Sequence, residues 1–197
     1  MIATERARPD VAERRKNFAI ARRFVDPKHL VFLDESGAQT HMTRRYGRAE
    51  GGARCVDSTP YRHWQTMTML SAIRHEGVME QASVVFDGSI DGPTFESYVE
   101  ECLAPALRPG DVVVMDNLPA HKMPSVRRAI EAVGCDLWYL PPYSPDFNPI
   151  EQLWSKVKSW LRRVGAGTFQ TVSQAVGDAL RDVKATECPN CFAACGY

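Results

Sequence analysis

The sequence has no long hydrophobic run, and it lacks an excess of charge of either sign. No apolar stretch approaches the roughly 20 residues that a membrane-spanning helix needs, and the N-terminus lacks the apolar segment of a signal peptide. We therefore expect a cytoplasmic protein with no membrane partner. The 197 residues are 44% hydrophobic and 24% charged, which argues against disordered and fibrous classes and fits one globular domain with a sizeable core.

The formal net charge is zero, whereas nucleic-acid-binding domains usually carry a basic footprint. Residues 1–28 are the exception, because they hold eight Arg or Lys and four acids. Within them, Asp10-Val11-Ala12-Glu13 after Pro9 predicts a capping box and a helix that runs to about Phe24. This basic helix is either a solvated surface helix or a contact to a DNA backbone.

A complete zinc motif is also missing. The three cysteines near the C-terminus, Cys188, Cys191 and Cys195, include a pair with zinc-ligand spacing, but no second pair or nearby histidine completes a tetrahedron. We expect reduced cysteines embedded in a helix. The scattered Cys55, Cys102 and Cys135 are typical of free thiols in a reducing cytosol.

Two continuous apolar runs each lead to an acid. Leu30 to Leu33 precedes Asp34, and Val112 to Met115 precedes Asp116. Continuous rather than alternating runs predict strands that are covered on both faces. Because open α/β sheets place their sites beyond the carboxyl ends of such strands, Asp34 and Asp116 should lie together if the strands are adjacent and parallel.

A third acid follows a stiff, proline-rich loop that begins at Pro141. Asn148 and Pro149 predict a helix start, with asparagine as N-cap and proline at the first helical position. The loop would thus deliver Glu151 to a defined place. The alternative is that Glu151 is the third-position acid of a capping box, bonded to the Asn148 backbone N–H.

Crowded carboxylates resist ionising unless a cation accompanies them. Asp34, Asp116 and Glu151 include no nitrogen or sulfur ligand, so the set suits Mg²⁺ or Mn²⁺. Two such ions about 4 Å apart would activate a water or a 3′-hydroxyl and stabilise the leaving oxygen. The sequence therefore predicts three catalytic, metal-binding acids that serve phosphodiester cleavage and joining.

The pattern Asp34, Asp116, thirty-four residues, Glu151 resembles the DDE triad of mariner-like transposases. More specifically, the chain from about residue 29 onward is similar to the bacterial insertion-sequence 630 family. That similarity rests on three motifs, Phe32-Leu33-Asp34-Glu35-Ser36, Val114-Met115-Asp116-Asn117-Leu118-Pro119-Ala120-His121-Lys122 and Pro141-Pro142-Tyr143-Ser144-Pro145-Asp146-Phe147-Asn148-Pro149-Ile150-Glu151. The resemblance implies an RNase H-like fold, a dimetal centre, and cut-and-paste transposition at TA dinucleotides.

The resemblance also implies a domain organisation. Residues 29–197 would be the catalytic domain, and residues 1–28 a basic helical lead-in. Family members carry helix-turn-helix domains ahead of the catalytic domain, for which there is no room in this sequence. The expected partners are transposon-end and target DNA at the nucleoid, a second copy of the chain, and, as one option, a separately encoded helix-turn-helix part.

The predicted fold is α/β, with a mixed five-stranded sheet of three antiparallel and then parallel strands. Strands are expected over 30–36, 63–73, 81–86, 111–116 and 136–140, and helices over 94–107, over 124–133 and after Asn148. An exposed hairpin is expected over 40–52.

Several cations are candidate DNA contacts: Arg44, Arg45, Arg48, His121, Lys122, Lys156 and Lys158. In the expected hairpin, the arginines with Tyr46 would track phosphates, or else form a solvated turn. His121 has the alternative of a local hydrogen bond at a helix start. Glu35 should point to the opposite strand face from Asp34, outside the metal site.

Two rival functions remain, an RNase H-like nuclease that stops at hydrolysis and an inactive relic that only binds DNA.

Overall fold

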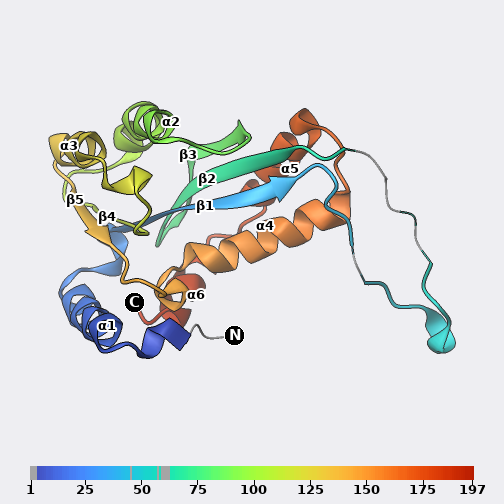
Figure 1. The fold of residues 1–197 in the computed structure, drawn as a ribbon, viewed down its shortest axis with the longest axis horizontal. Coiled ribbons are helices and arrows are strands. Elements are labelled where there is room, and N and C mark those ends of the chain that lie inside the picture. Colours follow the sequence, from blue (N-terminus) through green and yellow to red (C-terminus); the bar gives the residue numbers. More distant parts are fainter. Residues whose placement is uncertain (1–3, 45, 57, 59–62) are drawn as a thin grey trace.

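A five-stranded sheet with the order β3-β2-β1-β4-β5 forms the centre of the fold (Figure 1). The structure is a computed structural model and describes residues 4–44, 46–56, 58 and 63–197. The strands are β1 Leu30–Gln39, β2 Thr66–Arg74, β3 Gly77–Asp87, β4 Val112–Met115 and β5 Asp136–Tyr139. The strands begin or end a few residues away from the predicted bounds, most clearly β3, which starts at Gly77.

The strand pairing confirms the predicted mixed sheet. β1 pairs antiparallel with β2, and β2 pairs antiparallel with β3, whereas β4 runs parallel to both β1 and β5. In the parallel register Phe32 lies opposite Val114. Asp34 and Asp116, each two residues further along, therefore come to the same level of neighbouring strands.

Helices cover both faces of the sheet (Figure 1). One face packs against α2 Gly92–Tyr98, its continuation through the π-helical turn Val99–Leu103 and the 3-10 turn Ala104–Ala106, and α3 Pro124–Ala132. The other face packs against α1 Pro9–Ala21, α4 Ile150–Val164, α5 Phe169–Arg181 and α6 Glu187–Ala194. Side chains alternate between the two cores, so that Phe32 packs on the α4 side and Leu33 on the α2 side.

Two predicted helices differ in detail from the observed ones. The helix expected over 94–107 loses its α-helical form after Tyr98, ahead of Pro105, which has no N–H to donate to the preceding turn. The N-terminal helix begins at Pro9 without a capping box, because the Asp10 carboxylate pairs with Arg8 at 3.0 Å instead. The predicted capping box there is wrong.

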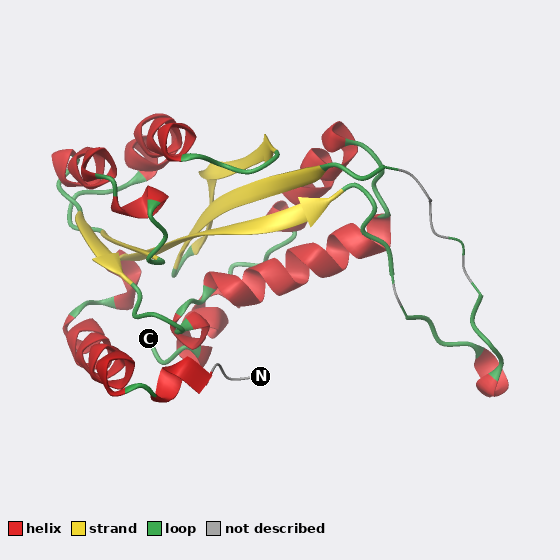
Figure 2. Ribbon diagram, in the orientation of Figure 1, coloured by secondary structure: helices red, strands yellow, loops and turns green. Residues whose placement is uncertain are grey.

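The described residues between β1 and β2, which are 40–44, 46–56, 58 and 63–65, include a long loop that extends away from the rest of the molecule (Figure 2). Among its described residues only Glu50–Gly52 form a regular element, a short 3-10 helix. Among the described residues of 40–52 there are no paired strands, so the expected hairpin is not observed there and a loop takes its place. In the part of the chain that the structure describes, no helix is long and apolar enough to cross a membrane.

Candidate active site

Asp34 lies within β1 rather than at its end, and its side chain is only 8% exposed. The indole Nε1 of Trp154 donates a hydrogen bond to Asp34 Oδ2 at 3.2 Å. Trp154 is 2% exposed and lies on α4, close to one turn after Glu151. This bond fixes the Asp34 carboxylate and ties the helix that carries Glu151 to the strand that carries Asp34.

Asp116 directly follows β4 and is held from two sides. Its Oδ1 accepts the Leu118 N–H at 3.0 Å and lies 2.6 Å from His121 Nδ1. The imidazole is 1% exposed, and its ring centroid lies 4.3 Å from that of Phe95. This burial corrects the predicted DNA contact at His121: the ring is inside the protein and makes the local contact that was the alternative interpretation.

The loop ahead of Glu151 has a fixed shape. Tyr143 has a φ of 55°, the left-handed region that few non-glycine residues adopt. The Asn117 side chain donates to the Leu140 carbonyl, joining the end of β4 to the start of the loop. The turn at Tyr143 and the hydrogen bond from Asn117 together fix the path of the loop that leads to α4.

The capping-box interpretation of Glu151 is wrong. Asn148 donates its backbone N–H to the Pro145 carbonyl at 3.0 Å, so the N–H has a partner other than Glu151. Its side chain does not cap α4, and Pro149 is the N-cap residue. The reason is the turn at Pro145–Phe147, which takes the N–H before the helix starts. Glu151 is left exposed at the first turn of α4.

The N-terminal helix supports this loop. Arg15 is buried, and it donates to Ser144 Oγ at 2.6 Å and to both carboxylate oxygens of Asp146 at 3.0 and 2.7 Å. Phe18 stacks on Phe147 with centroids 5.7 Å apart. From the other end of the chain, the Tyr197 hydroxyl donates to the Phe147 carbonyl at 2.7 Å. At least one of the α1 cations thus serves the active-site loop instead of solvent or DNA.

The three acids line one cavity of about 340 Å³, together with the proline-rich loop. Burial, followed by the charges of Glu151 and then Asp116, raises the pKa of Asp34 to about 7. Partial burial would raise the pKa of Asp116, but the adjacent His121 imidazole and the hydrogen bond from the Leu118 amide hold that pKa below its ordinary value. The surroundings of the two aspartates thus shift their pKa values in opposite directions, up for Asp34 and down for Asp116.

The donors in this cavity fit a hard divalent cation, because all three are carboxylates whose mutual repulsion such a cation would relieve. Among the described residues, no three His, Cys, Asp or Glu side chains already form a converged ligand set. The cavity thus gathers the acids without closing them around one point. Glu35 does not line it.

The remaining predicted contacts lie in different places. Lys156 is bound to Glu187 at 2.8 Å and to Asp182 at 3.3 Å. Lys122 is exposed in the segment after Asp116. Arg44, Arg48 and Lys158 line a second cavity. Arg45 lies outside the described residues.

Sequence reasoning missed the residues that hold the acids. Asn117 lies inside a quoted motif and Trp154 lies three residues after another, but a turn explains the first and an apolar helix face explains the second equally well. Arg15 lies far from the loop in sequence, so only the fold reveals the contact.

The cysteines are free thiols, and α6 carries Cys188 and Cys191.

Comparisons with known proteins agree with this geometry. A family model described as DDE superfamily endonuclease matches residues 29–174. The Transposable element Tcb2 transposase of Caenorhabditis briggsae is 27% identical over 126 residues, which cover 56% of this chain and 46% of that protein. The chain thus spans about half the length of this relative.

Solved structures show the same fold. The catalytic domain of Mos1 mariner transposase has a TM-score of 0.70 at 12% identity, covering 98% of this chain and 90% of that one. The Mos1 transposase paired-end complex with left transposon end has a TM-score of 0.74 at 16% identity, covering 100% and 65%. These likenesses confirm the RNase H-like fold. With the family model matching 146 residues that include all three acids, the chain belongs to the DDE superfamily of endonucleases.

Proposed function

We propose that this chain is the catalytic part of a cut-and-paste DNA transposase, which cleaves a DNA strand and transfers the resulting 3′-hydroxyl to a target. The observation that carries the proposal is the cavity shared by Asp34, Asp116 and Glu151. Membership of the DDE superfamily supports it, and so does the named activity of the Tcb2 and Mos1 relatives.

The same three acids would hold the cofactor. Mos1 catalytic domain structures contain Mn and Mg, and for this chain we propose two Mg²⁺ or Mn²⁺ ions. Bound there, the ions would activate the attacking oxygen and stabilise the leaving one. The chain's own residues supply position: Trp154 orients Asp34, His121 orients Asp116, and the loop braced by Arg15 places Glu151.

The partners follow from the relatives. The Mos1 complex contains a transposon end, and we propose transposon-end and target DNA as substrates, a homodimer as the active form, and a helix-turn-helix part supplied by another segment. Placement in the insertion-sequence 630 branch, with TA targets, is supported by the Pro141-to-Glu151 motif. The division at residue 28 is supported by the family match, which begins at residue 29.

Cleavage of intact DNA ends and strand transfer of pre-cleaved ends together test the function. Wild-type protein with Mg²⁺ should cut and join, whereas Asp116→Asn should bind DNA and do neither. Cutting without joining would favour the hydrolytic nuclease. Binding by the wild-type protein without either reaction would mark an inactive relic, and undiminished cutting by Asp116→Asn would refute the assignment of the acids.

A further inference from the structure

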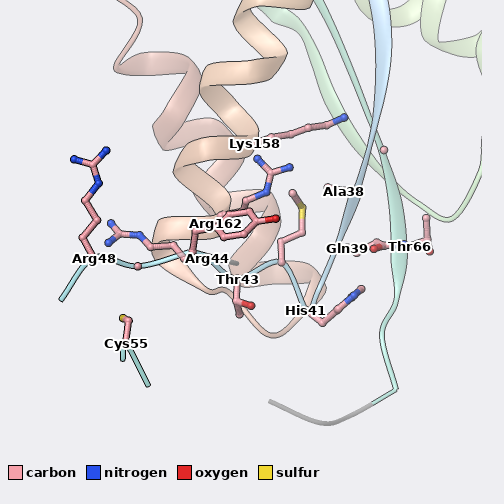
Figure 3. Close-up of a pocket in the computed structure, with 14 residues that line it drawn as sticks. Ala38, Gln39, His41, Thr43, Arg44, Arg48, Cys55, Thr66, Lys158 and Arg162 are labelled. Carbon is pink, nitrogen blue, oxygen red and sulfur yellow. The ribbon is translucent and has the colours of Figure 1, made fainter. Parts of the chain in front are cut away.

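A second cavity, of about 970 Å³, lies between the β1–β2 loop and the C-terminal half of α4 (Figure 3). Four cations line it: Arg44 and Arg48 from the loop, and Lys158 and Arg162 from α4. None of the described residues that line it is an Asp or Glu. In Figure 3, Lys158 and Arg162 extend from successive turns of the helix, and Arg44 and Arg48 extend from the loop. We refer to it as the basic cavity.

The charge of the basic cavity is not neutralised within the protein. Among the described residues, none of these four cations forms an ion pair with an acid. Lys156, on the same helix, shows the contrast, because Glu187 and Asp182 pair with it. A cluster of uncompensated cations raises the local potential and attracts an anionic polymer.

The geometry of α4 connects the basic cavity to the acids. At 3.6 residues per turn, Lys158 and Arg162 fall about 20° to either side of Glu151 around the helix axis, so the three share one stripe. With a rise of about 1.5 Å per residue, they lie about 10 and 16 Å further along it. Phosphates of one DNA strand advance about 3.4 Å per nucleotide along the axis, so this span corresponds to about three to five nucleotides.

We propose that the basic cavity binds backbone phosphates of one DNA strand. The scissile phosphate of the same strand, about three to five nucleotides away, enters the cavity lined by Asp34, Asp116 and Glu151, the acid cavity. The inference rests on the proposed function for its substrate. Tyr46, which also lines the basic cavity and is 91% exposed, presents an aromatic ring to a base or sugar of that strand. Recognition of this kind is independent of base sequence, because it reads phosphates.

The first test is binding, which does not require catalysis. A mixed-sequence DNA duplex is titrated in gel-shift assays without divalent metal, at several salt concentrations. Arg162→Glu should weaken binding about tenfold and make the negative slope of the log association constant against log salt shallower by about one. The matched control is Arg163→Glu, the neighbouring residue, which faces away from the stripe and lies over the Trp160 ring at 4.3 Å. It should leave both quantities close to wild type.

The second test locates the contact along the strand. Substrates are shortened one nucleotide at a time on each side of the scissile phosphate, and KM is measured with Mg²⁺. For wild-type protein, KM should rise when one flank falls below about three to five nucleotides, and Arg162→Glu should lose that rise. Because Arg44→Glu changes an exposed loop residue, it repeats both tests without altering α4.

The outcomes separate the two proposals. Equal binding and salt slopes for Arg162→Glu and Arg163→Glu would overturn the basic cavity as a DNA site, even if the wild-type protein cuts and joins DNA. A wild-type protein that binds as expected but never cuts would refute the proposed function and leave the phosphate site supported. A KM that rises equally in wild type and Arg162→Glu would refute the three-to-five-nucleotide placement.

Discussion

The two cavities along α4 are built in opposite ways. In the acid cavity, Asp34 and Asp116 are each held by a buried side chain, Trp154 and His121. In the basic cavity, Arg44, Arg48 and Arg162 are exposed, and within the described residues they pair with no acid.

The difference matches what each cavity would have to do. Bond breaking requires groups held within a fraction of an ångström, which buried supports provide. Holding a strand of repeating phosphates requires charge but little geometric precision. Substitutions in the acid cavity should therefore change rate and stability, and those in the basic cavity should change affinity.

The largest expected effect is on catalysis. Glu151→Gln removes one carboxylate charge from the acid cavity and should lower the cleavage rate by on the order of 10³-fold, while DNA affinity without metal stays close to wild type. Single-turnover cleavage and gel-shift titration measure the two quantities. A loss of affinity equal to the loss of rate would show that Glu151 also binds DNA, and that catalysis and DNA binding are not separated between the two cavities.

The next largest effect is on stability, and it follows removal of Trp154, the residue that holds Asp34. Trp154→Ala deletes a buried indole and should lower the free energy of unfolding by about 3–5 kcal/mol. Trp154→Phe keeps most of the ring and loses the donor, at a cost of about 1–2 kcal/mol. Urea denaturation measures both, and the exposed Arg162→Ala, expected within about 0.5 kcal/mol of wild type, is the control.

Stability should depend on pH through Asp34. Its pKa is about 7 in the folded protein and 3.8 ordinarily, so the folded state holds an extra proton between about pH 4 and 7. The free energy of unfolding should therefore fall by a few kcal/mol as the pH rises through that window. Thermal melts in EDTA should show this fall, and Asp34→Asn should remove most of it. An unchanged slope in that variant would show that Asp34 is not its source.

The smallest effect concerns the brace on the active-site loop. Because Asp146 is partly exposed, the coupling between Arg15 and Asp146 in a double-mutant cycle of Arg15→Met and Asp146→Asn should be about 1–2 kcal/mol. Arg15→Met should also slow cleavage, since the loop positions Glu151. If cleavage were unaffected, the N-terminal helix would support the fold alone.

Much of the fold could be predicted because the local hydrophobic pattern agrees with the burial of each strand in the folded protein. The runs at Leu30–Leu33 and Val112–Met115 are hydrophobic at every position, and the sheet buries both faces of those strands. Capping was predicted poorly, at both Asp10 and Asn148. In each case a nearby group, Arg8 or the Pro145 carbonyl, takes the hydrogen bond that a capping box needs.

The support of the candidate site was beyond sequence reasoning because its contacts join distant segments. Asp34 and Trp154 lie 120 positions apart, and Arg15 and Asp146 lie 131 apart. His121 lies near Asp116 in sequence, yet nothing in the local pattern showed that its ring would be buried. Residue type suggested a surface cation, and the packing on Phe95 decided otherwise.

The bond between Trp154 and Asp34 also gives the protein an optical probe of its own chemistry. The chain has four tryptophans, and Trp154 alone among them donates its indole N–H to one of the three acids within the described residues. With the other three replaced by phenylalanine, ultraviolet emission from Trp154 should change when a cation competes for that carboxylate. Metal occupancy could then be followed in real time, with no dye attached and no DNA present.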